Sequence, residues 1–260
     1  MTDTELREQI YQAALPLLKG RKLTDLVVGI SLLAVELDGT DLAVSYVLRD
    51  DLKGGCSIFP YMQSAVGKSA EEIGRWFVDG RDDLQRSVGA AVLTAASHAL
   101  ELTDTDSPEK PFGIELHPGD TVGMIGMIPP VAMRLKKLGC KLMIFDKGQC
   151  PAGNSDRDLY PMEQQEALLP RCDVLFLSGT TTVNGTAASL LELAKPRAAV
   201  LIGSSVPMIP KGYAGTPVRV LAGSWWRHED KAEIFRLISQ AAGMMVLGKY
   251  MVKKNVVLAE

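Results

Sequence analysis

Three consecutive threonines and a nearby asparagine have side chains that can bind an anion or a carboxylate. Thr180, Thr181, Thr182 and Asn184 lie between the apolar run "DVLFL" and the helix-compatible stretch "AASLLELAK". Hydroxyl and amide groups near a helix N-terminus, together with the helix dipole, favour negative charge. Capping of that helix by Asn184 or Thr186 is the alternative, but capping would use only one or two of these residues. We therefore predict that this segment contributes to a ligand-binding site.

Two serines and a tryptophan follow later apolar runs. Gly203, Ser204 and Ser205 come after "AAVLI", and Trp225 comes after "VRVLAG". Neither serine lies in a G-x-S-x-G motif, and Pro207 disfavours the strand-to-helix elbow that a nucleophilic serine needs. We predict that the serines hydrogen-bond a ligand and that Trp225 stacks on a flat one, with packing of the tryptophan as the alternative. No residue stands out as catalytic.

A glycine turn and a later aspartate complete the predicted site. Gly123 and Gly126 lie in "VGMIGMIPP", whose spacing is not that of the dinucleotide fingerprint G-x-G-x-x-G. Pro129 and Pro130 lack the amide hydrogens that bind a diphosphate, so we predict a close backbone approach to the ligand rather than a pyrophosphate site. Asp146 ends the run "CKLMIF", where a carboxylate can accept hydrogen bonds from a ribose. Such a residue favours S-adenosylmethionine over NAD, and a solvated turn aspartate is the alternative.

The elements that must position these residues are short apolar runs in the second half of the chain. They read "TVGMIG", "CKLMIF", "DVLFLSG", "AAVLIG" and "VRVLAG", and helix-compatible segments separate most of them. Near-continuous apolar runs are typical of strands that are buried on both faces, as in a parallel sheet covered by helices. Ligands bind beyond the carboxyl ends of such strands. The fold class predicted for this half is therefore Rossmann-like α/β.

The first half has a different pattern, which predicts a smaller α+β domain. We expect a helix over residues 5–18, then a hairpin in which "LVVGISLLAVEL" and "DLAVSYVL" flank Asp38 and Gly39. Two helices should follow, the first with Ser69 and Glu72 at the spacing of a capping box. The polar stretch "LTDTDSPEKPFG" predicts a boundary between domains 1–108 and 109–260. The apolar tail "GMMVLGKYMVKKNVVLAE" predicts either a packing arm for the other domain or a homodimer contact.

The residue counts argue against several classes of partner. The chain has 28 Lys and Arg against 31 Asp and Glu, a net charge of −3, and no basic stripe interleaved with aromatic residues. Nucleic acid is therefore not an expected partner. No uncharged apolar run approaches the roughly 18 residues of a membrane span, and the N-terminus has no cationic start. We predict a cytoplasmic protein that does not bind a membrane.

The possible metal ligands are scattered along the chain. Cys56, Cys140, Cys150 and Cys172 form no C-x-x-C pair, and none of the 3 histidines lies at a metal-ligand spacing from them. This distribution predicts no metal site made by protein side chains alone. A metal held through a bound chelator does not conflict with it.

Four motifs, "VGMIGMIPP", "GTTTVNGTAASLLELA", "LIGSSVPMIP" and "YAGTPVRVLAG", resemble the bacterial and archaeal family called putative heavy-metal chelation proteins, formerly a domain of unknown function. The resemblance covers the second half. The first half is similar to that family's N-terminal domain, which itself is similar to the N-terminal domain of enolase. The resemblance implies an enolase-N-terminal-like domain joined to a Rossmann-like domain, with a site between them. It also implies a role in making or processing metal-chelating molecules such as siderophore-, pterin- or flavin-like compounds.

Three hypotheses about function follow. In the first, the protein is an enzyme that acts on a heterocyclic or chelator-like molecule in an interdomain cleft. In the second, it is a methyltransferase-like protein that uses S-adenosylmethionine, with Asp146 on the ribose. In the third, it is a non-enzymatic carrier of a metal-chelator complex. Each predicts a small-molecule ligand.

Overall fold

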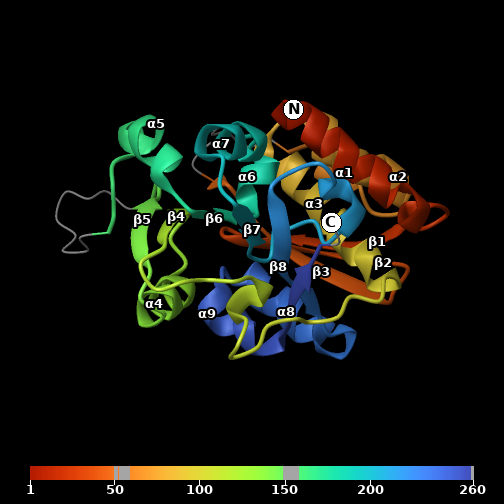
Figure 1. The fold of residues 1–260 in the computed structure, drawn as a ribbon. Helices are drawn as coiled ribbons and strands as arrows, with labels where there is room; N and C mark the ends of the chain where they lie inside the picture. The colour runs from red at the N-terminus through yellow and green to blue at the C-terminus, as the bar shows by residue number, and fades with distance from the viewer. Residues whose placement is uncertain (50–51, 53–58, 149–157, 259–260) are drawn as a thin grey trace.

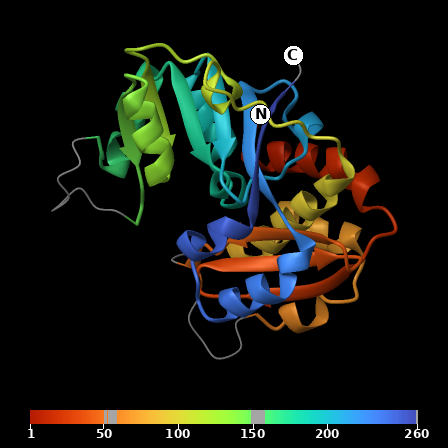
Figure 2. The same ribbon diagram turned by 90° about the horizontal axis from the view of Figure 1, so that it is seen from below.

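A single mixed sheet runs through the computed structural model, which describes residues 1–49, 52, 59–148 and 158–258. Within this part of the chain the sheet has nine strands in the order β1-β2-β3-β8-β7-β6-β4-β5, and β9 pairs with β8. The strands of the first half lie at one end and those of the second half at the other (Figures 1 and 2). The α/β prediction is confirmed.

The second half forms the parallel part of the sheet. Its strands follow the predicted apolar runs, and nearly all of their residues are buried. With β4 as its first strand, the order β5-β4-β6-β7-β8 places the second strand on one side of the first and the third on the other. The strands are β4 (Thr121–Ile125), β5 (Lys141–Phe145), β6 (Val174–Ser178), β7 (Ala198–Ile202) and β8 (Val218–Trp226).

Helices cover both faces of this parallel part, as buried apolar strands require. Helix α4 (Pro129–Lys137) lies on one face, and α5 (Gln165–Leu168), α6 (Thr180–Val183) and α7 (Ala187–Ala194) lie on the other (Figure 1). Short 3-10 turns occupy Met62–Ser64, Ser97–Ala99, Pro111–Gly113, Met162–Gln164, Leu169–Arg171, Pro210–Tyr213, His228–Asp230 and Gly248–Tyr250.

The first half contains α1 (Asp3–Leu18), β1 (Leu23–Val28), β2 (Leu32–Leu37), β3 (Asp41–Tyr46), α2 (Ala70–Asp79) and α3 (Asp83–Ala96). The predicted turn at Asp38 and Gly39 is confirmed, with φ values of 53° and 70°. The hairpin is also confirmed, because β2 and β3 pair antiparallel across this turn, but the run before the turn forms two strands rather than one. It bends at Gly29, where a Cβ atom would lie 2.3 Å from the carbonyl oxygen of Ile238, so the chain passes too close to α8 (Lys231–Ser239) for any side chain.

The helices of the first half begin as predicted. Ser69 caps α2 by accepting a hydrogen bond from the Glu72 amide at 3.1 Å. The Glu72 side chain does not complete the capping box, because it pairs with Lys68 Nζ at 2.6 Å. Helix α3 is buried almost all round, as its alanine-rich sequence predicts, and it packs against β2, β3 and α2. No helix in the described part of the chain is long and apolar enough to cross a membrane.

The C-terminal residues return to the first half before they rejoin the second. Helix α8 packs against β1 and β2, and α9 (Met244–Leu247) contributes to the same apolar cluster. Figure 2 shows these blue helices beside the orange strands. The buried carboxylate of Glu36 in β2 accepts hydrogen bonds at 2.9 Å from His228 Nε2 and Lys231 Nζ, which hold the start of α8. Strand β9 (Met251–Val257) then pairs with β8, so this part of the apolar tail packs within the chain, whereas Met245 in α9 is exposed.

Candidate functional site

The strand order predicts a ligand-binding crevice at the carboxyl ends of β4 and β6. The chain runs from β4 to β5 on one side and later returns to β6 on the other side of β4. The connections that follow β4 and β6 therefore run in opposite directions, and sheets of this kind bind their ligands at such a point. Gly126 directly follows β4, with φ 88°, and a Cβ atom there would lie 3.0 Å from the Cβ of Ser178, the last residue of β6. The two strand ends are therefore in close contact.

A pair of hydroxyl groups lies at this contact. Ser178 Oγ and Thr180 Oγ1 are 2.9 Å apart, and both residues are half-buried. Thr180 is the only one of the three threonines that is not fully buried. Ser178 is not among the predicted site residues, although it is the last residue before the glycine of "DVLFLSG", where a strand ends.

The other two threonines hydrogen-bond their own turn. Thr181 and Thr182 are 3% and 1% exposed, and their hydroxyls donate to the carbonyl oxygens of Ser178 and Gly179, both at 2.8 Å. They lie inside the short helix α6 rather than in a loop before a helix. Such bonds to a carbonyl of the preceding turn are a common use of threonine. The run of threonines therefore has a local structural explanation for two of its three members.

Asn184 lies where the two halves meet. Its side-chain oxygen accepts a hydrogen bond from Thr186 Oγ1 at 2.8 Å. The carbonyl of the preceding residue, Val183, accepts from Arg7 at 3.2 Å and from Arg86 at 2.9 Å, both of which belong to the first half. Burial, with a smaller effect of the nearby Arg86 charge, lowers the pKa of Arg7. Sequence reasoning missed both arginines because no local pattern marks them.

Asp146 shapes the turn after β4. Its two carboxylate oxygens accept hydrogen bonds from the amides of Met127 at 2.6 Å and Gly148 at 2.8 Å. The Gly126 amide also donates to the carbonyl of Phe145 at 2.8 Å. These bonds tie the ends of β4 and β5 together, so Asp146 lies beside the crevice and holds the glycine turn.

The two serines after β7 have different surroundings. Ser205 is 4% exposed and its Oγ accepts hydrogen bonds from Ser45 Oγ at 3.0 Å and from the Tyr46 amide at 2.8 Å, which join β7 to β3. Ser204 is half-buried, and its side chain has no hydrogen bond to a described residue. Gly203 has φ 116° and open space where a Cβ atom would lie.

Two predicted residues lie away from the crevice. Gly123 is buried within β4, where a Cβ atom would lie 2.6 Å from Cys172 Sγ. Trp225 lies on β8, two strands from β6; its Nε1 donates to Ser97 Oγ at 3.0 Å, and its ring lies 4.8 Å from that of His98 and 4.7 Å from Lys254 Nζ. Burial lowers the pKa of His98.

The described part of the chain contains no group of three or more His, Cys, Asp or Glu residues that could hold a metal ion. Cys56 and Cys150 lie outside the described residues. Cys140 and Cys172 are buried free thiols, and burial raises the pKa of both, that of Cys172 to about 11. A thiol with a raised pKa is a poor metal ligand, because the thiolate is the form that binds.

Each half of the chain matches a protein-family model, and the two models carry the same description. A family model described as "Putative heavy-metal chelation" matches residues 110–257, and a second model with the same description matches residues 11–97. A curated relative, an uncharacterized protein of Methanocaldococcus jannaschii, is 27% identical over 177 residues. That match covers 65% of this chain and 65% of the relative, so the chain spans about two thirds of the length of the relative it matches.

Two solved structures share the fold over almost the whole chain. One is a DUF364-family protein of unknown function from Pyrococcus horikoshii, with a TM-score of 0.76 and 22% identity, over 97% of this chain and 100% of that one. The other is a DUF364-family protein of unknown function from Desulfitobacterium hafniense, with a TM-score of 0.72 and 20% identity, over 96% of this chain and 98% of that one. At these identities the likeness establishes the fold.

Proposed function

Because the chain belongs to the family described as putative heavy-metal chelation, we propose that it binds a small heterocyclic or metal-chelator-like molecule at the carboxyl ends of β4 and β6. Siderophore-, pterin- and flavin-like compounds make up the ligand class. The ligand is the substrate of an enzyme or the cargo of a carrier, and both functions begin with the same binding step.

The close contact between Gly126 and Ser178 is the observation that carries this proposal. It lies at the point of the sheet where the strand connections diverge, which is where doubly wound sheets bind their ligands. The positive φ of Gly126 lets the main chain turn away from β4 without a side chain over the crevice. The backbone around Gly126 can therefore approach a flat ring closely.

The half-buried hydroxyls of Ser178 and Thr180 orient the ligand. They are hydrogen-bonded to each other at 2.9 Å, and each hydroxyl can take part in a further bond, so the pair can both donate to and accept from a ligand. Ser204 extends the polar lining toward β7, and Asn184 extends it toward the first half. Asp146 acts through the turn that it holds, by way of the Met127 amide.

A metal would reach this site as part of the ligand. The side chains at the crevice are mainly hydroxyls and an amide, which suit hydrogen bonding to oxygen and nitrogen atoms, whereas soft and borderline metals favour thiolate and imidazole. We therefore expect a metal-chelator complex to bind more tightly than the metal ion alone.

The test is isothermal titration of the purified protein with a pterin, a flavin, a catechol-type chelator, its metal complex and the metal salt alone. The variants are Thr180→Val, which keeps the side-chain shape and removes the hydroxyl, and the control Thr40→Val at an exposed turn. Loss of one hydrogen bond should weaken binding about two- to tenfold in Thr180→Val and leave Thr40→Val unchanged. Equal affinities in the two variants, or tight binding of the metal salt alone, would contradict the proposal. Product analysis of the binding compound separates an enzyme from a carrier.

A second candidate, a methyltransferase-like protein that binds S-adenosylmethionine, is favoured by the position of Asp146 directly after β5. A carboxylate oxygen accepts more than one hydrogen bond, so Asp146 can hold two amides and a ribose hydroxyl. S-adenosylmethionine and S-adenosylhomocysteine are titrated in the same way. A larger loss of affinity for these nucleosides than for the chelators in Asp146→Asn would support this candidate.

A further inference from the structure

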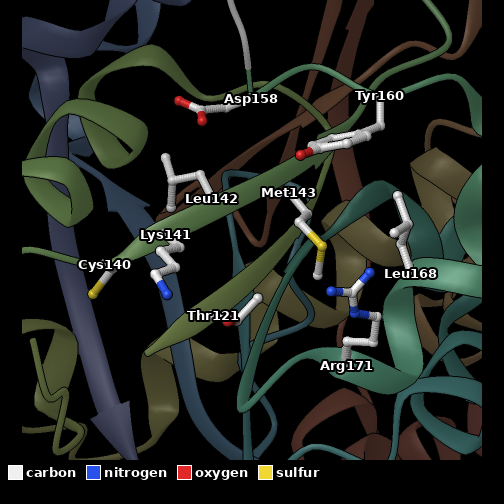
Figure 3. Close-up of a pocket in the computed structure, with 9 residues that line it drawn as sticks. All are labelled: Thr121, Cys140, Lys141, Leu142, Met143, Asp158, Tyr160, Leu168 and Arg171. Carbon is white, nitrogen blue, oxygen red and sulfur yellow. The ribbon is translucent and has the colours of Figure 1, made fainter. Parts of the chain in front are cut away.

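A hollow lies at the other end of the parallel strands from the proposed crevice. It has a volume of about 680 Å³ and lies along β5, the edge strand of the sheet (Figure 3). Thr121 and Lys141, the first residues of β4 and β5, line it, whereas the crevice of the proposed function follows the last residues of β4 and β6. The two sites are therefore separate. Its lining residues are Thr121, Cys140, Lys141, Leu142, Met143, Asp158, Tyr160, Leu168 and Arg171.

Most of this lining comes from one face of the sheet and from the segment 158–171, which follows β5 and packs on that face. Side chains alternate between the faces of a strand, so Lys141 and Met143 share a face. Met143 and Leu168 both pack with the large apolar cluster on the side of α5, and Arg171 follows on the adjoining 3-10 turn. Figure 3 shows the guanidinium group of Arg171 pointing toward the strands.

The hollow carries positive charge that no described acid neutralises. Lys141 and Arg171 are exposed, and neither makes an ion pair with a described residue. Asp158, the one acidic residue in the lining, pairs with Lys136 Nζ at 2.7 Å. Two cations on the wall of one concave surface attract an anion, and a guanidinium group can bind a carboxylate or a phosphate with two hydrogen bonds.

Neutral donors in the lining also lack partners. The hydroxyls of Thr121 and Tyr160 make no hydrogen bond to a described residue. A hydroxyl without a partner on the wall of a hollow can donate a hydrogen bond to an anion.

We propose that this hollow binds a small organic anion that carries a carboxylate or a phosphate. Arg171 and Lys141 hold the charged group, and the hydroxyls of Thr121 and Tyr160 donate to its oxygens. Met143 and Leu168 contact the apolar part of the molecule. This site does not depend on the crevice at β4 and β6.

The experiment is isothermal titration of the full chain at low ionic strength with inorganic phosphate, malonate and phenyl phosphate. We expect phenyl phosphate to bind more tightly than inorganic phosphate, because only phenyl phosphate reaches the apolar part. Arg171→Gln and Lys141→Gln should each weaken binding at least about tenfold, the effect of losing a charge-assisted hydrogen bond. Lys211→Gln, an exposed residue with the same change of charge, is the matched control.

Two further variants separate the possible causes of a loss. Arg171→Lys keeps the charge and should retain part of the affinity, which tells a lost contact from a lost fold. Thr180→Val should leave anion binding unchanged, which tells this site from the crevice. The inference is overturned if none of the three anions binds with a dissociation constant below about 1 mM, or if Lys211→Gln weakens binding as much as Arg171→Gln.

Discussion

The ends of β6 and β7 carry the same kinds of polar residue, yet those residues divide into two groups. Thr182 and Ser205 are buried and fully engaged, whereas Thr180 and Ser204 are half-buried. Ser205 holds β3 of the first half through the Tyr46 amide, and the neighbouring Ser204 has no such partner among the described residues. One part of the rim, the joined part, is held by internal hydrogen bonds, and we propose that the other part, the open part, binds the ligand.

The difference depends on what lies opposite each side chain. A hydroxyl next to a backbone donor of the other half is used to satisfy that donor, because an unpaired buried amide is costly. A hydroxyl with open space beside it stays available. Substitutions in the joined part should therefore change stability, and those in the open part should change binding.

The largest effect is expected at Gly179, where a Cβ atom would lie 2.5 Å from the Val206 amide nitrogen. Because this obstacle is main chain, Gly179→Ala should force the two segments apart and destabilise the protein by about 3 kcal/mol or more. Gly203→Ala meets no atom within 4 Å but has a positive φ, so strain of about 1–2 kcal/mol is expected. Urea unfolding of both variants measures the difference, and a smaller loss in Gly179→Ala would break the comparison.

Ser205→Ala should have the next largest effect. It leaves the Tyr46 amide without its acceptor, which costs about 1–3 kcal/mol. Ser204→Ala, one residue away, should stay within about 0.5 kcal/mol of the parent. Thermal and urea unfolding of the pair provide the test, and equal losses would mean that Ser204 also joins the halves.

The burial of His98 beside Trp225 should make the stability of the protein depend on pH. Burial lowers the pKa of His98 in the folded protein, so the unfolded chain binds its proton first as the pH falls. Stability from neutral His98 is present above about pH 6.5 and is lost as the pH falls from there through the folded-state pKa, by at most about 1.4 kcal/mol per pH unit. In this pH range the free energy of unfolding should depend less on pH in His98→Gln than in the parent. His117→Gln, a substitution of an exposed histidine, is the control and should keep the pH dependence of the parent. An unchanged slope in His98→Gln would show that folding does not lower the pKa of His98.

The smallest effect on stability is expected from Thr180→Val. Its hydroxyl pairs with Ser178 on the half-buried side of the rim, so the free energy of unfolding should change by less than about 0.5 kcal/mol. Thr182→Val removes a buried bond to the Gly179 carbonyl and should cost about 0.5–1.5 kcal/mol. Unfolding curves measure both, and a larger loss in Thr180→Val would move this residue to the joined part.

The amino-acid sequence determined the local elements of this protein. The five apolar runs became five parallel strands, because only a sheet covered on both faces buries such runs. Asp38 and Gly39 made the turn that their tolerance of positive φ predicts, and Ser69 capped its helix. The turn and the cap depend on interactions within a few residues, and the apolar composition of each strand is visible within its own run.

The tertiary structure alone decided which polar residues are buried in internal hydrogen bonds and which stay half-buried. Ser204 and Ser205 are equivalent in the pattern, but the partner of Ser205 in β3 is 159 residues away. The break between β1 and β2 at Gly29 depends on the close approach of Ile238, which is far from Gly29 in the chain. The position of α8 depends on Glu36, which is also far from that helix in the sequence. Contacts between distant segments leave no periodic signal in the sequence of either segment. A serine that will bond another segment and a serine that will not are the same residue type, so only the packing of the halves distinguishes them.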